Sequence, residues 1–358
     1  KPAVCVPNHM LEQFSREWLQ LYPQARLLAA NSKDLTGDNR RRFVARVATN
    51  DWDAIILTRG AFHHLSLQPD NEAAFLDSQL DEARRAIDNA NQNGGTSAAL
   101  RRVEKKLARR EEVIKAKRDM PRDPGVSFEE TGIDYLVIDE LHEYKNLDTI
   151  SSITEARIAG VQRAMDLYAK VGYLRATTNS NRVLTGATAT PIANSVAEMH
   201  VMQRYLDPEG LAAAEVADFD TWAATFGVIT QNLELGVAGG TTFKLKTRLS
   251  KFTNVPELQT MFRRFADVKT ADDLHLPKPD LQARPDGVRA PRLLLVPQTP
   301  AMTQYIAYLA ERAETASSQP GGMLPICTDG RKAALDLRLV NPNYGAASTK
   351  IDVAADEL

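Results

Sequence analysis

The stretch YLVIDELHEYKN, residues 135–146, begins as an apolar run and then changes to charged and polar residues. Its first five residues have the length and composition of a strand that is buried on both faces. Asp139 and Glu140 stand where this strand is expected to end. Two adjacent carboxylates at the tip of a buried strand indicate a functional site. The type of site has to be inferred from other segments of the sequence.

Three further apolar runs indicate that this strand belongs to a parallel sheet. Strands are predicted at residues 3–7, 53–58 and 182–186, and an amphipathic helix at Met10–Leu21 follows the first of them. Continuous apolar strands separated by helices predict an α/β fold with helices on both faces of the sheet. In such sheets ligand-binding side chains lie at the carboxyl ends of the strands, where the two acids also lie.

Length and composition are those of an ordinary globular protein. The 358 residues favour two lobes or one lobe with insertions, and no apolar run approaches the length that spans a membrane. The net charge of −2 means that any nucleic-acid contact requires a local basic surface. Cys5 and Cys327 show no metal-ligand spacing, which favours a reducing compartment without excluding a disulfide.

Residues 72–118 do not follow the alternation of strands and helices and are therefore an insertion between two strands. They are predicted to form an antiparallel helical hairpin, because apolar residues recur at helical spacing on both sides of NQNGGTS at 91–97. The second arm, Ser97–Arg118, carries nine basic residues against three acidic ones. Such an arm fits either a solvated helix face or a surface that follows nucleic-acid phosphates. The candidate phosphate contacts in this arm are Arg101, Arg102, Lys105 and Lys106.

The carboxylate pair fits the hydrolysis of a nucleoside triphosphate. An aspartate at a strand tip can hold Mg²⁺ through water, and the next acid can orient or deprotonate an attacking water. The alternative is a strand that simply ends in a capping or surface acid. A zinc site is disfavoured, because no second histidine follows His142 at the spacing that places two ligands on one helix face.

At residues 139–146, DELHEYKN resembles the DExH box of superfamily 2 helicase-like ATPases, and LTGATATPIANSVAEMHVMQRYLDP at 184–208 resembles motif III of the Swi/Snf-type branch. Similar segments occur in the family's order at 6–23, 54–65, 261–279, 292–309 and 335–358. GATATP departs from the family's Gly-Thr-Pro, which leaves open which threonine couples motif III to the DExH box.

The resemblance implies a RecA-like lobe of the P-loop NTPase type, with ATP and Mg²⁺ as cofactors. Asp139 would position Mg²⁺, Glu140 would act on the attacking water, and His142 would couple the site to motif III. The implied motif III residues are Thr185, Gly186, Thr188 and Thr190. The implied DNA-backbone contacts outside the hairpin are Pro7, Asn8, Thr58 and Arg59.

The resemblance also implies a division of the chain. The expected parts are a first RecA-like lobe at 1–71 and 119–208, the hairpin at 72–118, a helical protrusion and brace at 209–285, and the start of a second RecA-like lobe at 286–358. No Gly-Lys pair of a phosphate-binding loop occurs in the 358 residues. We therefore expect an internal segment of a larger cytoplasmic protein of a bacterium or phage, linked to methyltransferase or other domains.

The leading functional hypothesis is a segment of an ATP-dependent translocase that moves along double-stranded DNA, with no membrane partner. One alternative is a helicase that separates DNA or RNA strands. Another, from a different class, is a catalytically silent nucleic-acid-binding scaffold.

Overall fold

The computed structural model describes most of the chain, in two compact units. The described residues are 1–92, 127–149, 160–193, 195–235, 243–277, 280–316, 322–344 and 350–357, with single residues at 108, 112, 116, 151 and 158. Residues 1–230 and 247–267 form the first unit, and residues 231–246 and 268–358 form the second.

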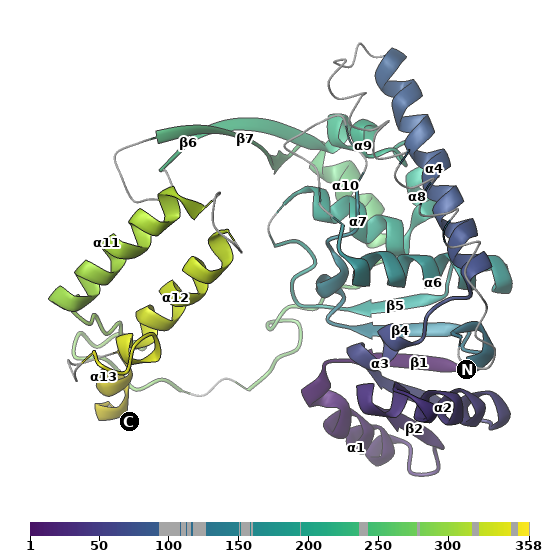
Figure 1. The fold of residues 1–358 in the computed structure, drawn as a ribbon, viewed down its shortest axis with the longest axis horizontal. Coiled ribbons are helices and arrows are strands. Elements are labelled where there is room, and N and C mark those ends of the chain that lie inside the picture. The colour runs from purple at the N-terminus through teal and green to yellow at the C-terminus, as the bar shows by residue number, and fades with distance from the viewer. Residues whose placement is uncertain are drawn as a thin grey trace. The chain divides into compact units, whose positions relative to one another are not determined.

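A five-stranded parallel sheet forms the centre of the first unit, in the order β2-β3-β1-β4-β5 (Figure 1). Its strands are β1 Pro2–Val6, β2 Leu27–Ala30, β3 Ala54–Thr58, β4 Tyr135–Asp139 and β5 Leu184–Ala187. The α/β fold with a RecA-like parallel sheet is thus confirmed. Four of these strands were predicted within two residues of their observed ends, whereas the four-residue strand β2 was missed.

Helices and 3₁₀ turns connect the strands of the sheet. Those before β4 are η1 Asn8–Met10, α1 Leu11–Leu21, η2 Ser32–Leu35, α2 Asp38–Thr49, α3 Arg59–His64, α4 Pro69–Gln92 and η3 Glu129–Thr131. Those after β4 are η4 Leu141–Tyr144, α6 Gln162–Thr178 and α7 Ala197–Leu206. The helix expected at Met10–Leu21 is therefore confirmed as α1.

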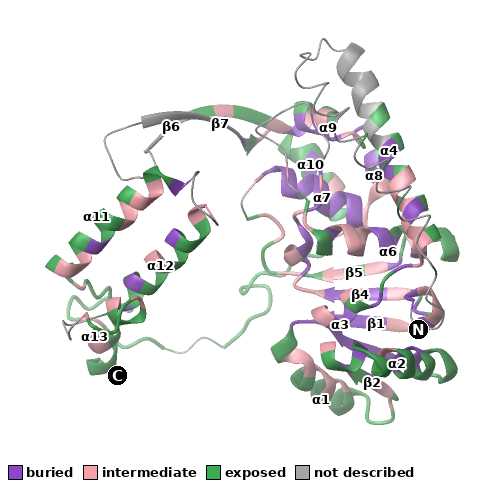
Figure 2. Ribbon diagram, in the orientation of Figure 1, coloured by how far each residue is buried: buried purple, intermediate pink, exposed green. Residues whose placement is uncertain are grey.

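Alternate residues of the central strands face opposite sides of the sheet, and both sides are covered. Cys5 of β1 and Leu57 of β3 belong to the larger cluster, which includes side chains of α2, α3 and α6. Val4 of β1 and Ile56 of β3 belong to a smaller cluster that packs against α1. Buried residues are accordingly concentrated in the interior strands of the sheet, as the purple segments in Figure 2 show. Burial on both faces explains why these strands are uninterrupted apolar runs.

The predicted hairpin is described only in its first arm. Helix α4, Pro69–Gln92, corresponds to that arm. The turn and the basic second arm lie outside the described residues, apart from three single positions. The antiparallel hairpin and the contacts of Arg101, Arg102, Lys105 and Lys106 therefore stay predictions.

Residues 209–285 differ from the helical protrusion and brace that the sequence predicts. Three helices are present, α8 Pro208–Ala213, α9 Phe219–Phe226 and α10 Val255–Arg263. Between α9 and α10, however, β6 Gly227–Leu235 and β7 Phe243–Phe252 form a two-stranded sheet. The pairing of β6 with β7 was not predicted from the sequence, and the assignment of this region as a protrusion and brace stays a prediction. Phe219, Trp222 and Phe226 share the buried face of α9, as their spacing predicts.

The described residues from 286 onward form helices rather than the expected strand and helix. The segment Arg292–Val296 has no strand partner, and Leu293 and Leu295 are 80% and 83% exposed. The expected strand is therefore not formed, since a strand requires a neighbour for its backbone hydrogen bonds. The helices are α11 Pro300–Glu314, α12 Met323–Leu335, η7 Leu337–Leu339 and α13 Lys350–Asp356. That this part begins a second RecA-like lobe stays a prediction.

Throughout the described part of the chain, every helix is too short or too polar to cross a membrane.

Candidate nucleotide and nucleic-acid site

A cleft of about 570 Å³ opens at the carboxyl ends of β1, β3 and β4. The strand register aligns these ends, because Val6 pairs with Thr58 and Cys5 pairs with Ile138. Segments far apart in the sequence therefore contribute to one site. The cleft is lined by Pro7, Asn8, His9, Met10, Arg59, Gly60, Asp139, Glu140, His142 and Glu143.

The backbone turns sharply between the two acids of the cleft. Asp139 is the last residue of β4, and Glu140 adopts the left-handed conformation with φ 57° and ψ 53°. A non-glycine residue in this region costs about 1–2 kcal/mol. Asp139 Oδ1 accepts a hydrogen bond of 3.0 Å from the backbone N–H of Glu140, which stabilises the turn. The turn allows both carboxylates to line the same cleft instead of alternating across the sheet.

His142 connects the acid pair to the loop that follows β5. Its Nδ1 lies 2.9 Å from Glu140 Oε2 and 3.0 Å from Thr188 Oγ1. Thr185 instead pairs with the hydroxyl of Tyr135 at 2.7 Å. Of the threonines left open by the sequence, Thr188 is thus the one that contacts the histidine.

Thr190 takes part in this arrangement indirectly. Its backbone N–H donates to Thr188 Oγ1 at 3.1 Å. This bond supports the hydroxyl that contacts His142, whereas no contact of the Thr190 side chain with His142 is described.

Gly186 allows the turn after β4 to pack directly against β5. A Cβ atom at this position would lie 2.3 Å from Cδ2 of Leu141. Leu141 stands between Glu140 and His142 and is 1% exposed. The glycine of motif III therefore contributes space for the DExH turn.

Glu143 joins two arginines at one side of the cleft. Its Oε2 lies 3.2 Å from Arg163 NH1 and 3.7 Å from Arg59 NH1, and its Oε1 lies 3.7 Å from Nε2 of His142. Sequence reasoning missed Glu143 and Arg163 as site residues. Arg163 has no local signal, since it is the second residue of α6 and reaches the cleft only in the folded chain.

A second link between the two motifs lies beneath the surface. Lys145 Nζ lies 3.3 Å from Oε1 of Glu198 in α7, and Oε2 of Glu198 accepts a 2.7 Å hydrogen bond from the backbone N–H of Ala193. The carboxylate of Glu198 thus holds the loop after β5 against the segment after β4. Lys145 belongs to the quoted motif, but its partner was not predicted.

A family model described as "Probable helicase domain" matches residues 1–270. The chain belongs to this helicase-domain family. The matched range contains the entire parallel sheet and every residue that lines the cleft. No curated protein and no solved structure matches the chain.

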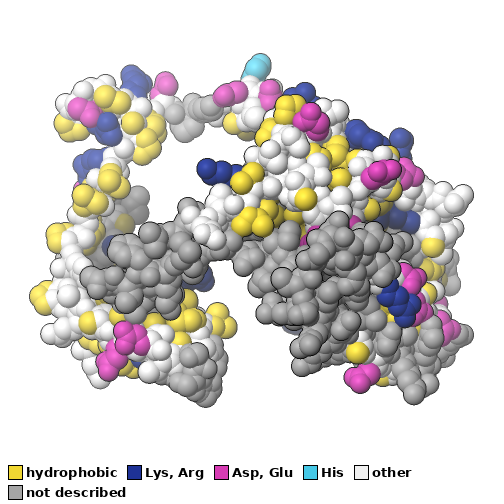
Figure 3. Space-filling view, turned by 90° about the horizontal axis from the view of Figure 1, so that it is seen from above, with side chains coloured by type: hydrophobic (Ala, Val, Ile, Leu, Met, Phe, Trp, Pro, Cys, Tyr) yellow, Lys and Arg dark blue, Asp and Glu magenta, His cyan; other side chains and the backbone are white. Residues whose placement is uncertain are grey.

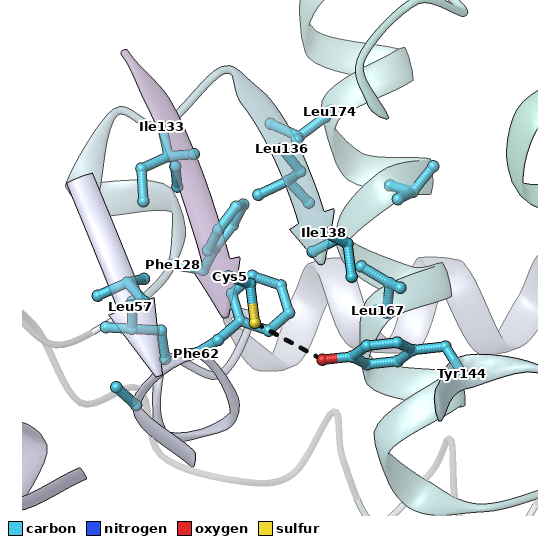
Figure 4. Close-up of a cluster of buried hydrophobic side chains, with 14 of the residues drawn as sticks. Cys5, Leu57, Phe62, Phe128, Ile133, Leu136, Ile138, Tyr144, Leu167 and Leu174 are labelled. Atoms are coloured by element: carbon cyan, nitrogen blue, oxygen red, sulfur yellow. Dashed lines mark hydrogen bonds between the residues drawn. The ribbon is translucent and has the colours of Figure 1, made fainter. Parts of the chain in front are cut away.

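Below the cleft, the helicase domain has a tightly packed apolar core (Figure 4). Cys5 of β1 and Tyr144 of η4 lie 3.7 Å apart, Sγ to hydroxyl, next to Phe62. Burial raises the pKa of Cys5 to about 11 and raises the pKa of Tyr144 well above its usual value. Both groups therefore stay neutral at physiological pH and serve as packing for the turn that carries His142.

The candidate DNA contacts of the helicase domain differ in their exposure. Pro7, Asn8 and Arg59 line the cleft. Thr58 is only 2% exposed, and its hydroxyl accepts from the N–H of Ala61 as the cap of α3. A contact of the Thr58 side chain with DNA stays a prediction that would require this cap to open.

On the face seen in Figure 3, described lysine and arginine side chains lie among acidic ones. Mixed charge of this kind agrees with the net charge of −2.

The donor set of the cleft is suited to Mg²⁺. Mg²⁺ favours oxygen ligands and commonly uses one or two carboxylates, with waters and substrate phosphates as the remaining ligands. Asp139 and Glu140 supply such carboxylates. Among the residues that the structure describes, no group of three or more His, Cys, Asp or Glu side chains is arranged to hold a metal without further ligands.

Proposed function

We propose that the chain is a segment of an ATP-dependent translocase that acts on double-stranded DNA. The observation that carries the proposal is the contact of His142 with both Glu140 and Thr188, which joins an acid pair at one strand end to the loop of the neighbouring strand. Membership of the helicase-domain family supports a nucleotide-hydrolysing motor of this general kind. Methyltransferase or other linked domains in the complete protein belong to the same proposal.

In this proposal each side chain has a separate task. Mg²⁺, when bound, neutralises charge on the phosphates of ATP. Asp139 is placed to hold that ion, and Glu140 is placed to orient an attacking water and accept its proton. Nδ1 of His142 lies next to both the Glu140 carboxylate and the Thr188 hydroxyl. A shift of the loop after β5 would therefore move the histidine and with it the carboxylate.

The experiment measures ATP turnover by the natural protein that contains this chain. Glu140→Gln is expected to retain ATP binding and to reduce turnover by ~10²–10⁴-fold, the usual contribution of a general base. The matched control is Glu17→Gln, which changes an exposed carboxylate of α1 that accepts a hydrogen bond from Gln13 one turn earlier and lies outside the cleft lining. Undiminished turnover in Glu140→Gln would reject the assignment of the base.

The nucleic-acid substrate requires a second measurement. A duplex translocase is expected to show ATP turnover that double-stranded DNA stimulates, without release of a short annealed strand. Efficient strand release in a gel assay would instead support a strand-separating helicase. Nucleic-acid binding without any ATP binding or turnover would support a silent scaffold.

A further inference from the structure

The Arg59–Glu143 pair connects the nucleic-acid side of the cleft to the acid pair. Arg59 is the first residue of α3, and Glu143 belongs to η4, which directly follows the acids. Glu143 also lies beside His142 and Arg163. A change in what Arg59 binds therefore acts on a carboxylate that adjoins His142.

The geometry of this pair shows that Arg59 has unused binding capacity. The distance of 3.7 Å between Arg59 NH1 and Glu143 Oε2 is longer than a hydrogen bond, and the side chains are 25% and 31% exposed. Nε of Arg59 is buried and has no hydrogen-bond partner among the residues that the structure describes. A guanidinium has five N–H donors in a planar fork that matches phosphate oxygens. A nucleic-acid phosphate thus offers Arg59 bonds that Glu143 does not make.

Glu143, in contrast, does not depend on Arg59 alone. Arg163 lies closer to it, with 3.2 Å between NH1 and the same Oε2 atom. When Arg59 turns to another anion, Glu143 keeps one cationic partner and stays beside His142. The exchange consequently leaves no charge without a neighbour.

We infer that the Arg59–Glu143 pair is an autoinhibitory contact, in which Glu143 competes with the phosphate backbone of nucleic acid for the guanidinium of Arg59. The inference rests on the proposed nucleic-acid contact of Arg59 and adds a regulating residue to it. Nucleic acid that takes Arg59 leaves Glu143 with Arg163 and His142 as its neighbours, so occupancy of the cleft wall is transmitted through this carboxylate to the acid pair. Glu143 is a positioning residue in this scheme.

Thermodynamic linkage predicts whether the loss of Glu143 strengthens or weakens the binding of nucleic acid. If nucleic acid must break the Arg59–Glu143 pair, then removing Glu143 tightens the binding of nucleic acid by the same free energy. A partly exposed ion pair contributes up to about 1 kcal/mol. Glu143→Gln is therefore expected to bind duplex DNA about two- to five-fold more tightly than the wild type.

The experiment measures the Kd of a short fluorescein-labelled DNA duplex by anisotropy at low salt, with the full chain. Four proteins are compared, namely wild type, Glu143→Gln, Arg59→Gln and the double variant. Arg59→Gln should bind more weakly, and in that background Glu143→Gln should no longer tighten binding. Asp51→Asn is the matched control, because it removes the carboxylate partner of Arg26 at 2.8 Å, in a pair that is not part of the cleft lining.

The outcomes separate this inference from the proposed function. Unchanged or weaker binding by Glu143→Gln would overturn the autoinhibitory contact while leaving nucleic-acid binding intact. Tighter binding that persists in the Arg59→Gln background, or that Asp51→Asn reproduces, would also overturn it, since the gain would reflect only the lost negative charge. Absence of duplex binding by the wild type would reject the proposed function itself, together with the inference that rests on it.

Discussion

Lys145 and Glu198 form a buried ion pair, with Nζ of the lysine 3.3 Å from Oε1 of the glutamate. The two residues are 9% and 2% exposed. Lys145 follows the turn at Glu140, and Glu198 lies in α7, which follows the loop after β5. The pair therefore joins the two motifs at a place where water and salt screen the charges poorly.

Replacing Lys145 with methionine should destabilise the first unit by about 3–5 kcal/mol, because the Glu198 carboxylate would stay buried without its cationic partner. Urea unfolding followed by tryptophan fluorescence measures this loss, since Trp18, Trp52 and Trp222 all lie in the first unit. A double variant with leucine at position 198 should be less destabilised than Lys145→Met. Asp51→Asn, which breaks a solvent-exposed pair, should change the stability far less than Lys145→Met. A similarly small cost for Lys145→Met would contradict the buried pair.

Gly186→Ala should destabilise the protein by about 1–3 kcal/mol, because the added Cβ would lie 2.3 Å from Cδ2 of Leu141. Shortening that neighbour with Leu141→Val should recover part of the loss, so the double variant should be more stable than the two separate effects predict. Gly172→Ala is the control, since its Cβ would have 4.0 Å to the nearest atom in the middle of α6. That change should stabilise by about 0.5–1 kcal/mol. Equal effects at both glycines would contradict the packing argument.

Stability should fall in acid because of His200. Burial, followed in size by the neighbouring Arg204 charge, lowers the pKa of His200 to about 3 from its ordinary value of 6.5. Between these values the unfolded chain binds a proton that the folded chain does not, so stability decreases as the pH falls from about 6.5 to about 3. Urea unfolding across this range should therefore show the stability advantage of wild type over His200→Gln shrinking toward acid. An advantage that is independent of pH would show that His200 does not titrate between the two states.

The basic arm at Ser97–Arg118 yields a prediction about salt. If it contacts phosphates, replacing Arg101, Arg102, Lys105 and Lys106 with glutamine should weaken duplex binding regardless of DNA sequence. The slope of log binding constant against log salt should also become shallower, by roughly 0.9 for each lost contact. Anisotropy titrations at several salt concentrations measure both effects. An unchanged slope would identify the arm as a solvated helix face.

Much of the sheet was predictable because its interior strands are buried on both sides. Each of β1, β3 and β4 is a short run of apolar residues, which is visible without knowledge of any neighbour. β2, Leu27–Ala30, is a short strand at the edge of the sheet that includes the exposed Ala29, and it was not predicted. The pairing of β6 with β7 depends on other segments and was not predicted. The strand expected at Arg292–Val296 was wrong, since this segment has no strand partner among the described residues.

The sequence by itself determined that Asp139 and Glu140 stand at the end of a buried strand, since a local run of apolar residues is enough to specify such a strand. It also determined the helicase-like order of the surrounding motifs. Only the tertiary structure selected Thr188 as the partner of His142, because Thr185 of β5 and the threonines of the following loop are close in sequence and differ only in which side chain they meet. The same holds for Glu143 with Arg59 and Arg163, and for Lys145 with Glu198. These partners come from separate elements, and an ion pair depends on the distance between charges, which is decided only when the strands align and the helices pack.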